Sequence, residues 1–124
     1  MRRDAREIAF QYIFASLFTS QELDKFTSSL KEADVTFATQ IVEQYEENKD
    51  ALKEKITKCL VGYEYTRVYK ADLAIMYEAL TEIEFLQTPP QVAINEALEI
   101  AKKYSTQKSA KFINGVLATI VKGE

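Results

Sequence analysis

Glycine and proline are scarce in this sequence, which has three glycines and two prolines among its 124 residues. A β-sheet protein needs many tight turns, and tight turns favour these two residue types. Their scarcity therefore predicts an all-α fold of long helices joined by short connections. Because 47% of the residues are hydrophobic, the chain can bury a sizeable core. We expect a single domain over residues 1–124, with helical halves at about 1–64 and 65–124.

Apolar residues recur at helical spacing along most of the chain, and the pattern predicts about seven helices in two packed bundles. Asp34 is the expected N-cap of the third helix, and Asn48–Asp50 is a candidate interruption before the fourth. Thr88 and Pro89 form the clearest boundary, since threonine is a preferred N-cap and proline a preferred first helical residue. The expected helices cover approximately residues 4–18, 21–31, 34–47, 51–62, 68–86, 89–104 and 106–120.

Two positions do not suit the helical faces on which they lie. Asp72 falls on the apolar side of its helix, and because an unpaired buried carboxylate is costly, we expect it to be capped or paired, with Arg67 and Lys70 as nearby candidates. Gly115 lies inside the last helix, where glycine costs about 1 kcal/mol relative to alanine. A glycine at such a position predicts the close approach of a neighbouring backbone or side chain.

The composition argues against catalysis. The chain has no histidine, which removes the commonest metal ligand and the usual general base. The only cysteine, Cys59, cannot form an intramolecular disulfide, and its helical spacing predicts a buried small side chain. Phosphate-binding loops, glycine-rich dinucleotide turns and metal-ligand clusters are absent from the sequence. We therefore expect no enzyme activity, no metal and no cofactor.

The sequence also lacks signals for a membrane or for secretion. No apolar run approaches the roughly 20 residues that span a bilayer, and the N-terminus has no apolar signal-peptide core. These observations predict a soluble cytoplasmic protein.

Charge is distributed unevenly, although the formal net charge is only −3. Arg2, Arg3 and Arg6 lie within the first six residues, and the segment Ile100–Gly123 has five lysines and no acid. Between these ends, the segment Glu22–Glu54 is rich in carboxylates. A chain that is basic at both ends suggests a localised surface for nucleic acid.

The three arginines are neighbours on the first helix, at spacings of three and four residues. Positive side chains at a helix N-terminus are unfavourable by roughly 0.3–1 kcal/mol each. A phosphate reverses this, because it pairs with the guanidinium groups and with free N–H groups of the first turn. Arg2, Arg3 and Arg6 are therefore candidate RNA contacts, and the alternative is a frayed, solvated terminus.

A second candidate site opens the last helix. Lys108, Ser109 and Lys111 offer donors to phosphates, and a partly exposed Phe112 suits stacking on an unpaired base, worth about 1–3 kcal/mol. The alternative is that Phe112 belongs to the core, because it lies beside Ile113 on the apolar stripe.

The acidic, aromatic middle of the chain, including Glu78, Glu82 and Glu84, is a third candidate site. Exposed acids are usually a solvated face, but they also suit a basic protein partner.

Four sequence stretches resemble a known family. Thr88–Ser105 reads T-P-P-Q-V-A-I-N-E-A-L-E-I-A-K-K-Y-S, and Lys111–Leu117 follows with K-F-I-N-G-V-L. Arg2–Phe14 is similar to the opening arginine-rich helix of that family, and Arg67–Met76 is similar to an internal helix. On these motifs the chain resembles the NusB family of bacterial transcription antitermination factors along essentially its whole length.

The resemblance implies an all-α fold, binding to boxA-type single-stranded RNA in leader and ribosomal transcripts, and a heterodimer with NusE, a ribosomal protein that doubles as a Nus factor. It implies a role in read-through by the RNA polymerase antitermination complex. NusE is expected to dock on an acidic helical face that includes Glu78 and Glu82. The expected RNA contacts form two groups that meet in space on this template: Arg2, Arg3 and Arg6, and Lys108, Ser109, Lys111 and Phe112.

Some positions depart from the family pattern, and other functions stay open. Asp4, Lys108 and Ala110 stand where the family usually has other residues, which leaves the RNA preference open. The alternative function is a protein-interaction module, such as a homodimer whose interface covers the basic surface. NusB-like domains also occur fused to RNA methyltransferases, but these 124 residues contain no catalytic half.

Overall fold

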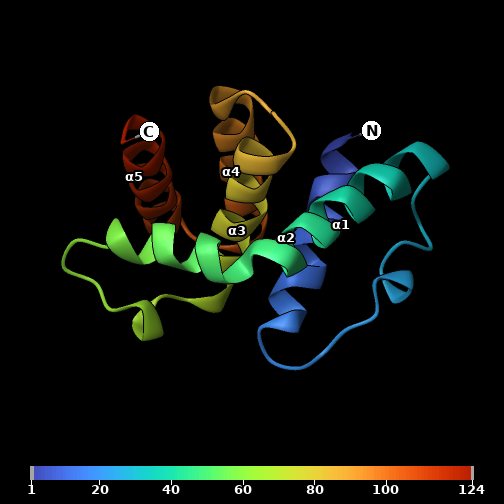
Figure 1. Cartoon of the computed structure of the whole chain (residues 1–124), viewed down its shortest axis with the longest axis horizontal. Helices are drawn as coiled ribbons and strands as arrows, with labels where there is room; N and C mark the ends of the chain where they lie inside the picture. The colour runs from blue at the N-terminus through green and yellow to red at the C-terminus, as the bar shows by residue number, and fades with distance from the viewer. Residues whose placement is uncertain (1, 124) are drawn as a thin grey trace.

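The computed structural model describes residues 2–123, in which five α-helices and two short 3-10 helices occur and no strand is present. The all-α prediction is confirmed, but the prediction of about seven helices in two bundles is wrong. Figure 1 shows the arrangement. The elements are α1 (Arg2–Ser16), η1 (Leu23–Lys25), α2 (Glu32–Lys58), η2 (Tyr65–Arg67), α3 (Lys70–Phe85), α4 (Pro90–Tyr104) and α5 (Gln107–Lys122).

The miscount arises in the first half of the chain. The expected second helix is reduced to the single turn of η1, since the threonine and serines at 27–29 favour turns over helix interiors. The expected third and fourth helices are one helix of 27 residues, and Asp34 lies inside it instead of capping it. Asn48 does not break α2, because its side-chain Nδ2 donates to the carbonyl of Gln44 one turn back, at 2.9 Å.

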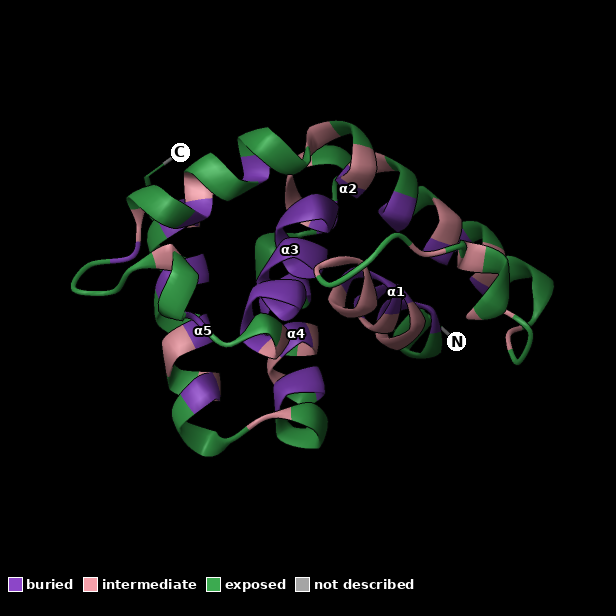
Figure 2. Cartoon of the chain, turned by 90° about the horizontal axis from the view of Figure 1, so that it is seen from below, coloured by how far each residue is buried: buried purple, intermediate pink, exposed green. Residues whose placement is uncertain are grey.

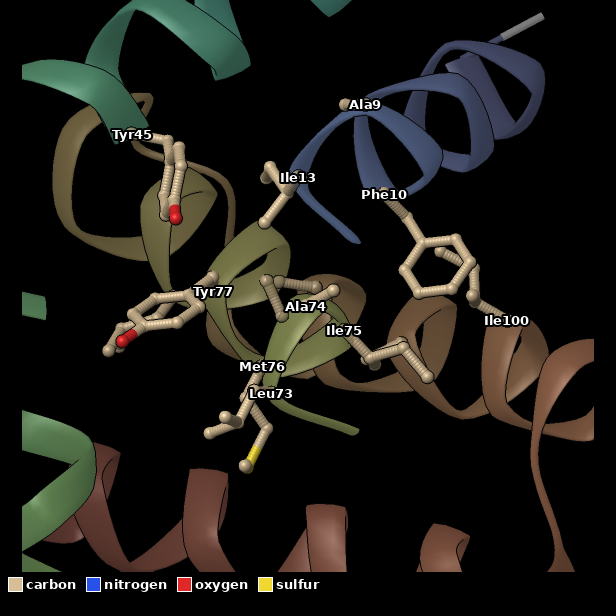
Figure 3. Packing of buried hydrophobic residues seen from close by; sticks show 14 of the residues in the cluster. Ala9, Phe10, Ile13, Tyr45, Leu73, Ala74, Ile75, Met76, Tyr77 and Ile100 are labelled. Atoms are coloured by element: carbon tan, nitrogen blue, oxygen red, sulfur yellow. The ribbon is translucent and has the colours of Figure 1, made fainter. Parts of the chain in front are cut away.

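The central helix of the fold is α3, which packs against all four other α-helices. Every residue of α3 from Asp72 to Glu82 is buried, and Figure 2 shows α3 as the most deeply buried helix. A helix that is apolar on nearly every side belongs inside a protein. In Figure 3, Ile13 of α1, Tyr45 of α2 and Ile100 of α4 lie around this helix.

Helix α2 joins the two ends of the molecule. It runs across the other helices in Figure 1 and contacts α1, α3 and α5. Buried residues from all five α-helices therefore form one hydrophobic cluster. No helix among the described residues is long and apolar enough to cross a membrane.

The two C-terminal helices begin differently. At α5 the hydroxyl of Thr106 accepts a hydrogen bond from the backbone N–H of Ser109 at 3.0 Å, which is a standard N-cap. At α4 the N-cap is Pro89, not Thr88 as predicted. The Thr88 hydroxyl instead donates to a carboxylate oxygen of Glu82 at 2.9 Å. A buried carboxylate is costly without hydrogen-bond donors, and Thr88 supplies one of them.

Candidate nucleic-acid interface

A groove of about 800 Å³ lies between the start of α5 and the segment that leads into α3. Four of its lining residues are the RNA-contact candidates at the start of α5, so the structure brings this predicted group together. The lining residues are Tyr63, Arg67, Val68, Tyr69, Asp72, Thr106, Lys108, Ser109, Lys111 and Phe112.

The cap at Thr106 determines how the α5 residues face the groove. Because the helix starts there, Lys108 and Lys111 are one turn apart and both are exposed. Ser109 is buried between them. Phe112 is half-buried against the core. Phe112 therefore combines the two expected alternatives: one part of its ring packs against the core, and the other part lines the groove.

Aromatic side chains that the sequence analysis did not select line the opposite wall. Tyr63 and Tyr69 are 59% and 71% exposed, which is high for large aromatic residues, and Arg67 is exposed between them. The Tyr63 ring meets the Phe112 ring edge-on, with centroids 4.9 Å apart. Tyr63 and Tyr69 lie outside the apolar stripes of the helices, so hydrophobic periodicity does not indicate that they belong to a site. The available signal was the density of aromatic and basic residues around η2.

Asp72 lies at the floor of the groove and is 3% exposed. The prediction that it is paired is confirmed, but the predicted partners are wrong. Neither Arg67 nor Lys70 pairs with it among residues 2–123, and the Ser105 hydroxyl donates to its Oδ1 at 2.8 Å.

The arginines of α1 are largely engaged in contacts within the protein. Arg3 forms a bidentate salt bridge with Glu96 of α4, with N–O distances of 3.0 and 2.8 Å. The guanidinium of Arg2 lies 4.2 Å from the ring centre of Phe37. Arg2 and Arg3 remain exposed, so both are still accessible to a phosphate.

Arg6 does not lie on an exposed surface, so its expected place among the RNA contacts is wrong. It is 6% exposed, and its Nε and Nη2 donate to the Glu82 carboxylate at 2.8–3.0 Å. This pair ties α1 to α3. The pKa of the Arg6 guanidinium is raised, because its bonds to Glu82 outweigh the opposing effect of burial.

The expected acidic docking face does not exist at Glu78 and Glu82, because both side chains are fully buried. Burial and the neighbouring Glu82 carboxylate raise the pKa of Glu78 well above its usual value. Burial would also raise the pKa of Glu82, but the adjacent Glu78 and the hydrogen bonds from Arg6 and Thr88 hold it below its usual value. The two pKa values are therefore shifted in opposite directions, which favours a proton on Glu78 over one on Glu82. Neither Glu78 oxygen has a hydrogen bond of normal geometry among the described residues.

The two predicted RNA-contact groups do not meet in space as expected. In Figures 1 and 2, α1 and α5 lie on opposite sides of α3 and α4. Polar contacts join α1 to α4 along its length, including Arg3 with Glu96 and Glu7 with Tyr104 at 2.7 Å. The groove lies beyond the end of α4, so α4 separates it from the arginines.

This arrangement defines a small all-helical protein with an open groove that combines aromatic rings with cationic side chains. Among the described residues, no cluster of acidic or cysteine side chains is placed to hold a metal ion. The family model described as "NusB family" matches residues 3–122. The chain therefore belongs to the NusB family, as its motifs predicted. This is a family of transcription antitermination factors and not of enzymes, which confirms the prediction of a non-catalytic protein.

Two curated relatives carry the description "Transcription antitermination protein NusB". The protein from Clostridium botulinum (strain Alaska E43 / Type E3) is 39% identical, with 98% of each chain covered. The protein from Clostridium novyi (strain NT) is 35% identical, again with 98% of each chain covered.

Solved structures share the fold. NusB of T. maritima is 28% identical with a TM-score of 0.89, covering 98% of this chain and 91% of that one. A chain from a crystal structure of antitermination factors NusB and NusE in complex with dsRNA is 21% identical and also has a TM-score of 0.89. That comparison covers 99% of this chain and 97% of the other.

Proposed function

We propose that this protein is a cytoplasmic antitermination factor that binds boxA-type single-stranded RNA together with NusE and promotes read-through by RNA polymerase. The observation that carries the proposal is the groove at the start of α5. Its rings, Tyr63, Tyr69 and Phe112, suit stacking with unpaired bases, and the exposed Lys108 and Lys111 suit phosphates.

The arginines at the start of α1 form a second, separate part of the proposed RNA surface. Arg2 and Arg3 are exposed there, whereas Arg6 acts inside the protein by holding α1 against α3 through Glu82. We therefore assign Arg6 a positioning role and keep only Arg2 and Arg3 as phosphate contacts.

A NusB of the same fold is known in complex with NusE and dsRNA, which supports NusE as a partner and RNA as the class of ligand. Since Glu78 and Glu82 are buried, NusE docking is assigned to no residue here.

The proposal is tested by fluorescence-anisotropy titration of a boxA-type RNA at several salt concentrations, with and without NusE. Replacing Lys108 and Lys111 with alanine removes two phosphate contacts, so the log–log salt slope should become shallower by about 1.4. A matched variant, K25A/K122A, removes two lysines that do not line the groove and should bind as the wild type does.

Wild-type affinity in K108A/K111A would contradict a role for the groove. The alternative of a homodimer that covers the basic surface is examined by light scattering on the same samples. A stable dimer that RNA does not dissociate would overturn the proposal in favour of a protein-interaction module.

A further inference from the structure

We propose that Asp72 makes the groove prefer nucleobases that carry an exocyclic amino group over uracil. The inference rests on the proposed RNA-binding function and adds to it a determinant of base identity. The juxtaposition that carries it is a buried carboxylate at the floor of a groove whose walls are aromatic.

Asp72 keeps unused hydrogen-bonding capacity although it is almost fully buried. A carboxylate has about four acceptor positions on its two oxygens. The structure gives the Asp72 side chain one hydrogen bond among residues 2–123, from the Ser105 hydroxyl to Oδ1 at 2.8 Å. Arg67 also lines the groove, but its ion pair is with Glu64, at 3.6 Å. A ligand that brings N–H donors to the groove floor would therefore use the remaining acceptor positions.

The aromatic rings in the walls of the groove cannot distinguish one base from another. Every base has a π-face, so stacking on Tyr63, Tyr69 or Phe112 tolerates all of them. The Thr106 hydroxyl is used in the helix cap, where it accepts from the Ser109 N–H and donates to the Ser109 hydroxyl at 3.2 Å. The Ser109 hydroxyl can both donate and accept, so it does not select a base either. Asp72 differs because an ionised carboxylate only accepts.

The amino groups of cytosine, adenine and guanine donate, whereas uracil presents a carbonyl oxygen where cytosine has its amino group. Uracil does have one donor on this edge, its N3–H, but two carbonyl oxygens flank that donor and a carboxylate repels both of them. Cytosine and uracil are pyrimidines of nearly equal stacking area, so their difference isolates this contact. A hydrogen bond to a charged group is worth about 1.5–3 kcal/mol net, which corresponds to at least about tenfold in affinity.

The test compares 12-nucleotide oligo(C) and oligo(U) at pH 7.5 and fixed salt, by fluorescence anisotropy with the full chain. We expect the wild type to bind oligo(C) about tenfold more tightly. The preference should fall to within about twofold in D72N, because asparagine can donate as well as accept. The control S105A removes the hydroxyl that binds Oδ1 but keeps the carboxylate, and it should retain the preference.

A chemical probe makes the test independent of how D72N folds. Oligo(2-pyrimidinone ribonucleoside) lacks only the 4-amino group of cytosine, and the wild type should bind it about as weakly as it binds oligo(U). Equal wild-type affinity for the three oligomers, or an unchanged preference in D72N, would overturn the inference. If, in that case, Y69A weakened the binding of all three oligomers equally, the proposed RNA-binding function of the groove would still stand. Binding of none of the three, with or without NusE, would count against both.

Discussion

At the scale of single residues, charged side chains in the interior do more to join helices than to meet partners. Arg6 and Glu82 come from positions 76 residues apart, and local pattern cannot reveal such a pair. A helical pattern predicts exposure for charges that lie off its apolar stripe, which is why Arg6, Glu78 and Glu82 were assigned to surfaces. The exposure of Lys108 and Lys111 could be predicted, because the spacing of polar residues in an amphipathic helix indicates which side faces solvent.

Removing the anion of the buried pair should unfold the protein readily. E82Q leaves the Arg6 guanidinium buried without a counter-charge, and breaking such a pair costs about 3–5 kcal/mol. Urea denaturation followed by circular dichroism at pH 7 measures the loss. The matched control is E84Q on the same helix, whose pair with Lys55 is partly open to water and should matter much less. Because the pKa of Glu82 is held low, its contribution is present above the unfolded pKa and is lost as the pH falls through the folded one. An E82Q deficit that persists unchanged in acid would contradict this account.

Glu78 should show the opposite pH dependence. Its pKa is raised in the folded state, so the folded protein binds more protons than the unfolded one at pH values between the two pKa values. The free energy of unfolding therefore falls as the pH rises through that window. E78Q removes this titration, and its thermal midpoint relative to the wild type should increase steadily from about pH 4.5 upward. A difference that is the same at pH 4.5 and pH 8 would show that Glu78 does not titrate in this way.

At the scale of elements, sequence periodicity located α1, α3, α4 and α5 but not the course of the chain between α1 and α3. Leu23, Phe26 and Leu30 do pack against the core, so their apolar spacing was a real signal of burial and not of helix. Asn48 was treated as a breaker, although an asparagine that bonds one turn back is compatible with a helix. The walls of the groove come from both kinds of segment, which explains why one half of the site was predicted and Tyr63 and Tyr69 were not.

The glycine inside α5, Gly115, allows a prediction about the stability of that helix. It was expected to admit a close neighbour, but a Cβ built there has no atom within 4 Å, and the residue is exposed inside α5. G115A should therefore stabilise the protein by about 1 kcal/mol, the difference in helix propensity. Thermal melts compare it with A118G, an exposed position on the same helix, which should lose a similar amount. If G115A were neutral or destabilising, some contact in solution would have to occupy that space.

At the scale of the whole molecule, α4 determines how RNA can use the two basic regions. Arg3 is paired with Glu96, which precedes the last residue of α4, Tyr104, by eight residues, or about 12 Å of helix. The two regions also lie on opposite sides of α3 and α4. Under the proposed function the two basic regions are therefore separate RNA contacts, and an oligonucleotide too short to span their separation should contact only one of them.

This separation predicts that RNA length decides which residues matter. A tetranucleotide held in the groove should lose affinity in K108A/K111A but not in R2A/R3A, whereas a 12-nucleotide RNA should be weakened by both. For the longer RNA the two losses should add within about 0.5 kcal/mol, because residues that far apart and without shared partners act independently. Isothermal titration calorimetry of the wild type, the two double variants and their combination measures this, with K25A/K122A as the control for net charge. An equal loss of tetranucleotide affinity in R2A/R3A would mean that the arginines and the groove form one continuous site, and that α4 does not separate them in the complex.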